Sequence, residues 1–384
     1  MAGQKDMKQR NMTEKDKSSS LGQVLEGGDN TYSGSLLEVD DLKMYFHTRD
    51  GVVQAVNGVS YKLEAGKTIG IVGESGSGKS VTAMTLMGLI DMPPGKIEGG
   101  DVRYKGVSLL ELNEKELRKI RGNKIAMIFQ DPMTSLNPVY KVGHQLAEPL
   151  RIHRGMKKKE AWARAVELLH LVGIPSPEQR VKEYPHQFSG GMRQRVMIAM
   201  ALACDPDILI ADEPTTALDV TIQAQIIQLM QDLQKESNSA IVMITHDLGV
   251  VADTADDILV MYAGRPVEYG SVEDVFYRPS HPYTWGLMGS LPKSISDLRQ
   301  REEKVELLPI EGMPPSLIDL PCGCTFHPRC PYAREICRKQ DPAMEELAET
   351  PGKKHTARCH FAGEPGFTKE NMESIAFAHV GGSA

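Results

Sequence analysis

The chain has 384 residues, of which 41% are hydrophobic and 25% are charged, and its formal net charge is −7 at pH 7. This length accommodates one large domain with additional segments, and the acidic balance argues against a nucleic-acid-binding surface. No run of about 18 apolar residues is present to cross a membrane, and the first residues lack the apolar segment of a secretory signal. We therefore expect a soluble, cytoplasmic chain that binds no nucleic acid.

The N-terminal segment, residues 1–34, is rich in Lys, Asp, Ser, Gly and Gln and poor in large apolar side chains. Such a composition cannot bury enough apolar surface to offset the entropy of ordering the chain. The sequence therefore predicts a disordered tail here.

A phosphate-binding motif follows the apolar run 68–72. It has the form G-x-x-x-x-G-K-[ST] and comprises Gly73, Glu74, Ser75, Gly76, Ser77, Gly78, Lys79 and Ser80. Glycines let backbone N–H groups turn towards phosphate oxygens, the lysine adds a positive charge, and the serine hydroxyl can reach Mg²⁺. A helix that begins here points the positive end of its dipole at the same anion. The sequence predicts binding of a nucleoside triphosphate.

Polar residues also follow three further apolar stretches. Gln130 ends the stretch 125–129, Asp212 and Glu213 end the stretch 208–211, and His246 follows the stretch 240–245. Alone, the acid pair could be an ordinary strand end and the histidine could be structural. Two shorter motifs lie nearby, Ser189-Gly190-Gly191 before a helical run and Ala217-Leu218-Asp219 before a helix with one apolar face.

In this order, these motifs resemble the nucleotide-binding domain of ATP-binding cassette (ABC) proteins over about residues 35–275. The resemblance implies an α/β P-loop fold with a parallel-sheet core. It also implies a small antiparallel β-subdomain near residues 36–66 and a helical subdomain at about residues 131–190. No long coiled-coil insertion separates Gln130 from Ser189, which argues against the DNA-acting members of this superfamily.

The resemblance also implies a role for each motif residue in binding ATP and Mg²⁺ and in hydrolysing ATP. Lys79 would neutralise phosphate charge, and Ser80, Gln130 and Asp212 would serve the magnesium ion. Glu213 would orient or deprotonate the attacking water, and His246 would contact the γ-phosphate. The signature Ser189-Gly190-Gly191 and the D-loop Asp219 would act across a dimer interface. An aromatic residue, Phe46 or alternatively Tyr45, would stack on adenine.

The C-terminal region, residues 276–384, begins with a segment that resembles the one following the cassette in oligopeptide and dipeptide importers. This segment is Arg278-Pro279-Ser280-His281-Pro282-Tyr283-Thr284, and Met192-Arg193-Gln194-Arg195 resembles the D-type ATPase of those importers. The resemblance implies peptide uptake at the cytoplasmic face of the membrane. It also implies a related F-type ATPase as partner, two permease subunits and an extracytoplasmic peptide-binding protein. Import of nickel or glutathione, a soluble ABC protein and a degenerate regulatory ATPase are alternatives.

Five of the six cysteines fall within residues 322–359, whereas Cys204 lies apart and is expected to be a small buried hydrophobe. Clustered cysteines in a cytoplasmic chain indicate metal, and their wide spacing favours an iron–sulfur cluster over zinc. The resemblance implies a [4Fe–4S] cluster in a loop-rich metal-binding domain, held by Cys324, Cys330, Cys337 and Cys359. Two alternatives remain: Cys322 in place of Cys324, and zinc with His327, His355 or His360.

Overall fold

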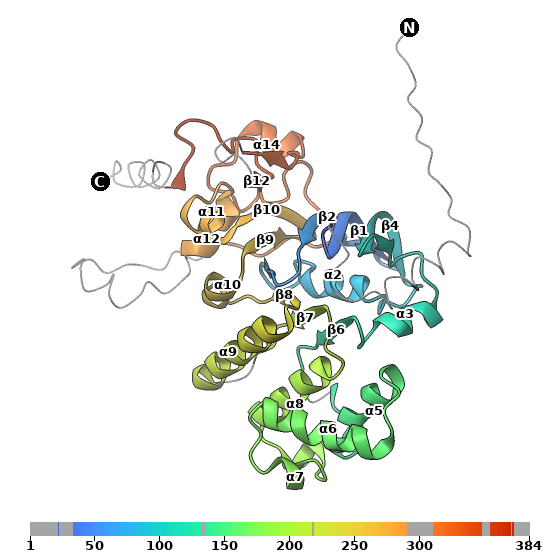
Figure 1. Ribbon diagram of the computed structural model, residues 1–384. Helices are drawn as coiled ribbons and strands as arrows, with labels where there is room; N and C mark the ends of the chain where they lie inside the picture. The colour runs from blue at the N-terminus through green and yellow to red at the C-terminus, as the bar shows by residue number, and fades with distance from the viewer. Residues whose placement is uncertain are drawn as a thin grey trace, which may run out of the picture.

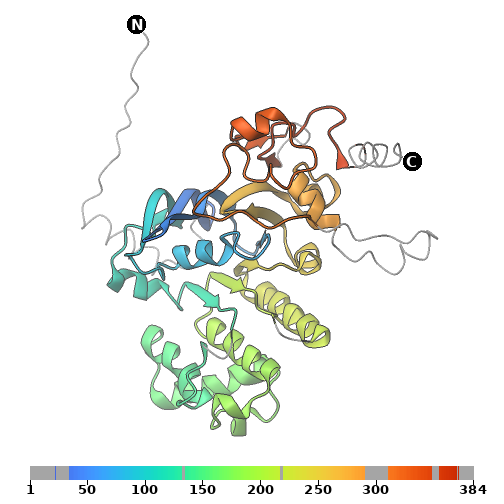
Figure 2. The same cartoon turned by 180° about the vertical axis from the view of Figure 1, so that it is seen from behind.

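The computed structural model describes residues 34–131, 135–216, 219–289, 310–347 and 354–369, together with Gly22 and Asn371. Apart from Gly22 and Gly34, the predicted disordered tail lies outside the described residues. Figures 1 and 2 show the antiparallel sheet and the P-loop helix in the middle of the molecule, the helical subdomain below them and the C-terminal region above.

The core is an eight-stranded sheet in the order β11-β12-β10-β9-β3-β8-β7-β6. Its parallel part consists of β6 (Ile125–Ile128), β7 (Ile208–Asp212), β8 (Ala240–Ile244), β3 (Thr68–Val72) and β9 (Asp257–Tyr262). Every residue of β3, β7 and β8 is buried, as expected for parallel strands covered on both faces. The predicted α/β P-loop fold is confirmed, although the sheet is mixed because β10 (Arg265–Ser271) and the strands beyond it are antiparallel.

Helices connect the parallel strands. They are α2 (Lys79–Leu86), α9 (Val220–Ser237) and α10 (Leu248–Thr254). Helix α9 buries Ile226 and Leu233 and begins at Asp219, whose carboxylate accepts a hydrogen bond from the Ile222 amide at 3.0 Å. These connections bring the carboxyl ends of β3, β7 and β8 to one edge of the sheet, where the motifs lie.

The antiparallel sheet has the order β2-β1-β4-β5. Its strands are β1 (Leu37–Thr48), β2 (Gly51–Leu63), β4 (Gly95–Tyr104) and β5 (Val107–Ser108). The sequence predicted this subdomain near residues 36–66, which covers β1 and most of β2. The structure adds β4 and β5 to the sheet. Helix α3 (Glu114–Ile120) follows and begins with a capping box formed by Asn113 and Glu116.

The helical subdomain packs in one apolar cluster with β6, β7, β8 and α9. It consists of α5 (Val142–His153), α6 (Lys158–Leu171), α7 (Pro177–Arg180), the 3₁₀ turn η1 (Pro185–Gln187) and α8 (Gly190–Leu202). Helix α6 buries Ala161, Ala165, Leu168 and Leu169, the apolar positions read from the sequence. Helix α8 follows the predicted end of this subdomain at residue 190 and packs in the same cluster.

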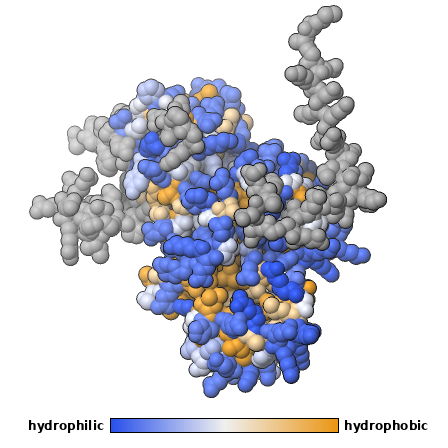
Figure 3. Space-filling model, viewed as in Figure 1, coloured by the Kyte–Doolittle hydropathy of each residue, from blue (hydrophilic) through white to orange (hydrophobic). Residues whose placement is uncertain are grey.

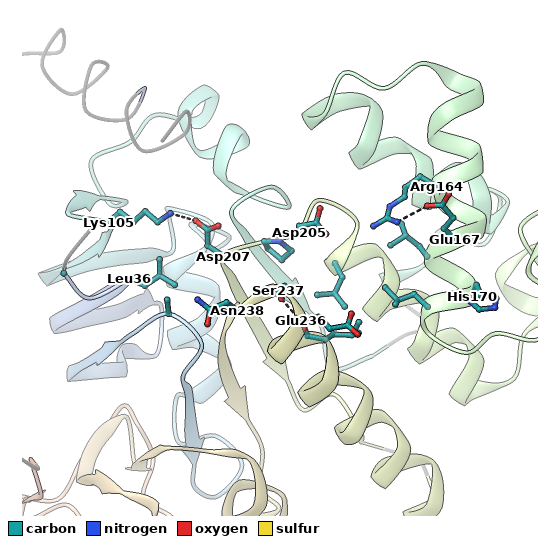
Figure 4. Close-up of a pocket in the computed structure, with 17 residues that line it drawn as sticks. Leu36, Lys105, Arg164, Glu167, His170, Asp205, Asp207, Glu236, Ser237 and Asn238 are labelled. Atoms are coloured by element: carbon teal, nitrogen blue, oxygen red, sulfur yellow. Dashed lines mark hydrogen bonds and ion pairs between the residues drawn. The ribbon is translucent and has the colours of Figure 1, made fainter. Parts of the chain in front are cut away.

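A polar cleft of about 710 Å³ opens between the helical subdomain and the sheets. Lys105 pairs with Asp207 at 2.7 Å on one wall, and Arg164 pairs with Glu167 at 2.9 Å on the other (Figure 4). The predicted motif residues lie elsewhere than in this lining. The lining of this cleft also includes apolar side chains, among them Leu168, Leu202 and Leu233.

The C-terminal region is joined to the core sheet. Its elements are α11 (Val272–Tyr277), α12 (Pro282–Gly289), α14 (Glu335–Lys339), β11 (Glu345–Glu346) and β12 (Thr356–Ala357). Strand β12 pairs with β10, with Ala357 opposite Glu268, so this region extends the sheet. No helix in the described part of the chain is long and apolar enough to span a membrane.

Candidate functional site

The phosphate-binding loop connects β3 to α2, and two of its glycines are required by close packing. Gly73 and Gly78 have φ angles of 150° and 100°. An added Cβ would lie 2.1 Å from the Met261 carbonyl oxygen at Gly73 and 2.2 Å from the Ala55 carbonyl oxygen at Gly78. Since these neighbours are backbone atoms, they cannot move aside as a side chain would. The loop is therefore locked between β2 and β9.

Lys79 lies beneath this loop and is buried, with 5% of its surface exposed. Its Nζ donates hydrogen bonds to the carbonyl oxygens of Gly73 at 2.8 Å and Glu74 at 3.0 Å. Burial lowers the pKa of Lys79, while the charges of Glu213 and Asp212 act in the opposite direction. The buried Ser77 hydroxyl has no hydrogen-bond partner among the described residues. A free donor beside a buried ammonium group suits this loop to an anion such as a phosphate.

The proposed magnesium ligands meet where β7 ends. The Ser80 hydroxyl donates a hydrogen bond of 2.9 Å to the Asp212 carboxylate. Burial raises the pKa of Asp212, and the bond from Ser80 partly opposes that shift. A hydroxyl and a buried carboxylate in contact form a fitting oxygen-donor pair for Mg²⁺.

Glu213 is the centre of a hydrogen-bonded group. Its carboxylate accepts hydrogen bonds from Gln130 Nε2 and from the Thr216 hydroxyl, both at 2.9 Å, and it lies 3.4 Å from His246 Nδ1. Its φ angle is +46°, and its amide donates to the Ile244 carbonyl oxygen at 2.8 Å. The sequence predicted three members of this group but missed Thr216, which lies one turn after Glu213. The side-chain amide of Gln130 contacts Glu213, and its predicted service to Mg²⁺ stays a prediction.

Ser189 and Asp219 lie at helix starts, where they cap their own helices. Ser189 Oγ accepts a hydrogen bond from the Met192 amide at 3.3 Å, with Gly190 and Gly191 in the first turn of α8. An added Cβ at Gly190 would meet nothing within 4 Å, so this helix start is open. Within the described part of the chain, no hydrogen bond links Ser189 or Asp219 to the phosphate loop. Their predicted action across a dimer interface concerns a second subunit and stays a prediction.

The predicted adenine-stacking residues lie on β1. Phe46 is half-buried and packs against the apolar cluster shared by the two sheets. Tyr45 is also half-buried, and burial raises its pKa.

The sequence matches two family models. The ABC transporter model matches residues 56–216, from β2 to Thr216. A second model, the C-terminal region of oligopeptide/dipeptide transporters, matches residues 267–337. The oligopeptide transport ATP-binding protein OppD of Bacillus subtilis (strain 168) is 56% identical over 315 residues, covering 82% of this chain and 87% of the relative.

The chain belongs to the oligopeptide/dipeptide group of ABC transporter ATP-binding proteins. The dipeptide transport ATP-binding protein DppD of the same organism is 52% identical, covering 84% of this chain and 94% of the relative. Among solved structures, a dimeric ATP-binding cassette in a post-hydrolysis state with ADP and Pi is 30% identical with a TM-score of 0.56. It covers 62% of this chain and 98% of the cassette. As an ABC ATPase, this chain binds ATP with Mg²⁺ and hydrolyses ATP.

The four cysteines implied by the resemblance line a single small cavity. They are Cys324, Cys330, Cys337 and Cys359. Burial raises the pKa of Cys324, and it raises that of Cys330 and Cys359 to about 12. Cys322, in contrast, is exposed. No group of three or more His, Cys, Asp or Glu side chains within the described ranges is placed to hold a metal ion.

The three histidines considered as zinc ligands make other contacts. His355 Nε2 lies 2.8 Å from the buried carboxylate of Glu268. His327 and His360 contact the carbonyl oxygens of Cys324 and Gln340 at 2.9 and 2.8 Å. Cys204 is buried, as expected of a small hydrophobe.

Proposed function

We propose that this chain is the ATP-hydrolysing subunit of a membrane importer that takes up oligopeptides or dipeptides. The proposal rests on one observation: the chain matches peptide transport proteins both in the cassette and in the region that follows it. The chain is 56% and 52% identical to two peptide transport ATP-binding proteins over more than 80% of its length, and residues 267–337 match the C-terminal region of oligopeptide/dipeptide transporters. The match outside the cassette favours peptides over nickel or glutathione.

Hydrolysis is assigned to the groups gathered at the edge of the sheet. Mg²⁺, bound near Ser80 and Asp212, would supply positive charge to the phosphates. Lys79 would exchange its two backbone acceptors for phosphate oxygens. Glu213 would hold the attacking water, with Gln130 and Thr216 fixing its carboxylate and His246 completing the group. Positioning and charge stabilisation provide most of the rate in such reactions.

The open start of α8 supports a paired arrangement. Ser189, Gly190 and Gly191 lie at the N-terminus of a 13-residue helix, where backbone amides suit a phosphate on another subunit. We propose that the partner is a related F-type ATPase, so that two composite sites form. The dimeric cassette with 30% identity supports pairing of such domains.

An apolar groove beside the helical subdomain is the proposed contact with the permease. It has a volume of about 350 Å³, and its lining includes Phe129 and Ile152, which are 40% and 67% exposed. Figure 3 shows apolar side chains gathered over this subdomain and its junction with the core. Phe129 precedes Gln130, whose amide reaches Glu213 at 2.9 Å, so an occupant of the groove could influence hydrolysis. Two permease subunits would place the chain at the cytoplasmic face, with a peptide-binding protein on the other side.

We also propose that the C-terminal cavity holds a [4Fe–4S] cluster on Cys324, Cys330, Cys337 and Cys359. A single zinc ion needs its donors around one point, whereas a cluster spreads four thiolates over four irons. Four thiols that line one small cavity fit the second requirement. A bound cluster would hold this loop-rich region together. Zinc remains the alternative outcome of metal analysis.

Two experiments test the proposal. In the first, the chain is affinity-purified from detergent-solubilised membranes. Recovery of permease chains and a second ATPase supports the importer, whereas a purely soluble pool contradicts it. The complex is then reconstituted with its binding protein, and ATP turnover is measured with peptides, nickel and glutathione. Stimulation by peptides alone is expected, and Lys79→Ala serves as the inactive control.

In the second experiment, iron, acid-labile sulfide and zinc are measured on the anaerobically purified chain. About four irons and four sulfides per chain, lost in Cys330→Ser, support the cluster. One zinc ion per chain without sulfide would contradict the cluster and support a zinc site.

A further inference from the structure

A side chain of the cysteine-rich region reaches into the phosphate loop. Arg329 donates to the Glu74 carboxylate through both ends of its guanidinium group, Nη1 to Oε2 at 2.6 Å and Nη2 to Oε1 at 3.0 Å. The two residues are 255 positions apart in the sequence. The Arg329 side chain is 5% exposed and that of Glu74 is 28% exposed. This is a two-pronged, largely buried ion pair, the geometry in which arginine binds carboxylates most strongly.

The arginine is itself held in place. Its Nε donates to the Glu311 carbonyl oxygen at 2.9 Å, and Nη2 also donates to the Ile310 carbonyl oxygen at 3.2 Å. Nη1 also lies 3.4 Å from the Tyr262 hydroxyl. All three nitrogens of the guanidinium group are thus engaged, so its orientation is fixed before it meets Glu74. The hydrogen bonds with Glu74 raise the pKa of Arg329 further, so it stays charged.

A second contact from beyond the cassette acts on the same loop residue. The Glu74 amide donates a hydrogen bond of 2.9 Å to the hydroxyl of Tyr283, which is buried on α12. The Glu74 carbonyl oxygen accepts from Lys79. Thus the amide and the carboxylate of Glu74 are both held by residues that follow the cassette in sequence. Only the carbonyl is held from within the loop.

We propose that Arg329 is a positioning residue for the nucleotide site, which fixes the phosphate loop through Glu74 and neutralises its charge. An unpaired carboxylate at this position would repel the triphosphate, and a mobile loop would lose entropy on binding it. Arg329 removes both costs. The C-terminal region therefore contributes to ATP affinity. This inference rests on the proposed ATPase function and extends it to a residue outside the cassette.

The test is a double-mutant cycle on the full chain, with affinity read by titrating a fluorescent ATP analogue in the presence of Mg²⁺. Arg329→Gln should weaken binding about tenfold, the change produced by 1.4 kcal/mol. Arg329→Lys should weaken ATP binding less, because lysine keeps the positive charge but cannot form the two parallel hydrogen bonds of a guanidinium group. In a Glu74→Gln background, Arg329→Gln should cost less than about twofold, because no carboxylate is then left unpaired.

The control is Lys339→Gln, which removes one positive charge from an exposed pair of the same region and should leave affinity unchanged. Thermal unfolding of each variant separates loss of binding from loss of fold. If Arg329→Gln does not fold, the same cycle is run with Arg329→Lys.

Wild-type affinity in Arg329→Gln would overturn the inference. So would an equal loss with and without the Glu74 carboxylate, because that would mark a general structural defect. A wild-type chain that binds no ATP contradicts the proposed function instead, so the two failures are distinguishable.

Discussion

The nucleotide site and the cysteine-rich region are built in opposite ways. At the nucleotide site, each functional residue follows a buried strand, and short backbone contacts place it. Glu213, for example, is fixed by a left-handed turn and by its amide bond to Ile244. In the described part of the cysteine-rich region, the regular elements are a five-residue helix and two strands of two residues. Side chains far apart in the sequence provide much of the order there.

The buried carboxylate of Glu268 illustrates this second way of building. It accepts hydrogen bonds from the amides of Ser280 at 2.7 Å and His281 at 3.0 Å, and it contacts His355 at 2.8 Å. One carboxylate thus ties β10, the start of α12 and the segment before β12. We expect chemistry to depend on the first region, while stability and nucleotide affinity depend on the second.

The largest effect is expected from Glu213→Gln. Replacing the carboxylate with an amide removes its capacity to accept a proton from water, so turnover should fall about 10²- to 10⁴-fold while ATP binding is retained. The metal content of the cysteine region should not change. Steady-state ATPase assays of the reconstituted complex and nucleotide titration measure the two quantities. Asp232→Asn, on the exposed face of α9, is the charge-matched control, and turnover at the wild-type rate in Glu213→Gln would remove Glu213 from its role.

Loss of the proposed cluster should affect the two regions differently. Cys330→Ser should release this proposed cluster and make the C-terminal region sensitive to protease. The cassette should stay folded, and ATP affinity should fall about as far as in Arg329→Gln, about tenfold. Limited proteolysis, metal analysis and nucleotide titration follow the three effects. Cys322→Ser is the matched control, because Cys322 is exposed and should leave the metal bound. Equal metal loss in both variants would reassign the ligands.

Sequence reasoning succeeded where function depends on local order. A motif that follows an apolar strand must lie at the end of that strand, so Lys79, Asp212 and Glu213 could be placed in advance. Residues paired across long separations could not be placed. Nothing next to Arg329 in the sequence points to Glu74, and Glu268 reads as an ordinary charged position on β10. The pairing of β12 with β10 was missed for the same reason, since a two-residue strand carries no periodic signal.

A third test concerns the carboxylate of Glu268. Glu268→Ala would leave the buried His281 amide, the partly buried Ser280 amide and His355 without their acceptor. Since an unsatisfied buried donor costs about 1–3 kcal/mol, the C-terminal region should lose about 2–4 kcal/mol of stability. Hydrogen exchange at Ser280 and His281 measures this opening locally. Glu345→Gln on β11 is the exposed control. Unchanged protection in Glu268→Ala would mean that Glu268 does not hold the region in place.

The smallest expected effect concerns a buried polar group of the cassette. It tests whether the cassette tolerates the loss of such a group better than the C-terminal region does. The Tyr61 hydroxyl on β2 is buried and has no hydrogen-bond partner among the described residues. Burial raises its pKa above the ordinary value of 10.0, so the unfolded chain releases the proton first and stability falls as the pH rises above 10. Tyr61→Phe should therefore raise stability by about 1 kcal/mol at neutral pH and reduce the alkaline loss.

The control for this last test is Tyr104→Phe on β4, which removes a hydroxyl that donates to Asp207 and should lower stability. Urea unfolding at pH 7 and pH 10.5 measures both variants. A loss of stability in Tyr61→Phe would show that this hydroxyl has a partner, and that the antiparallel sheet also depends on a polar contact which its sequence pattern does not reveal.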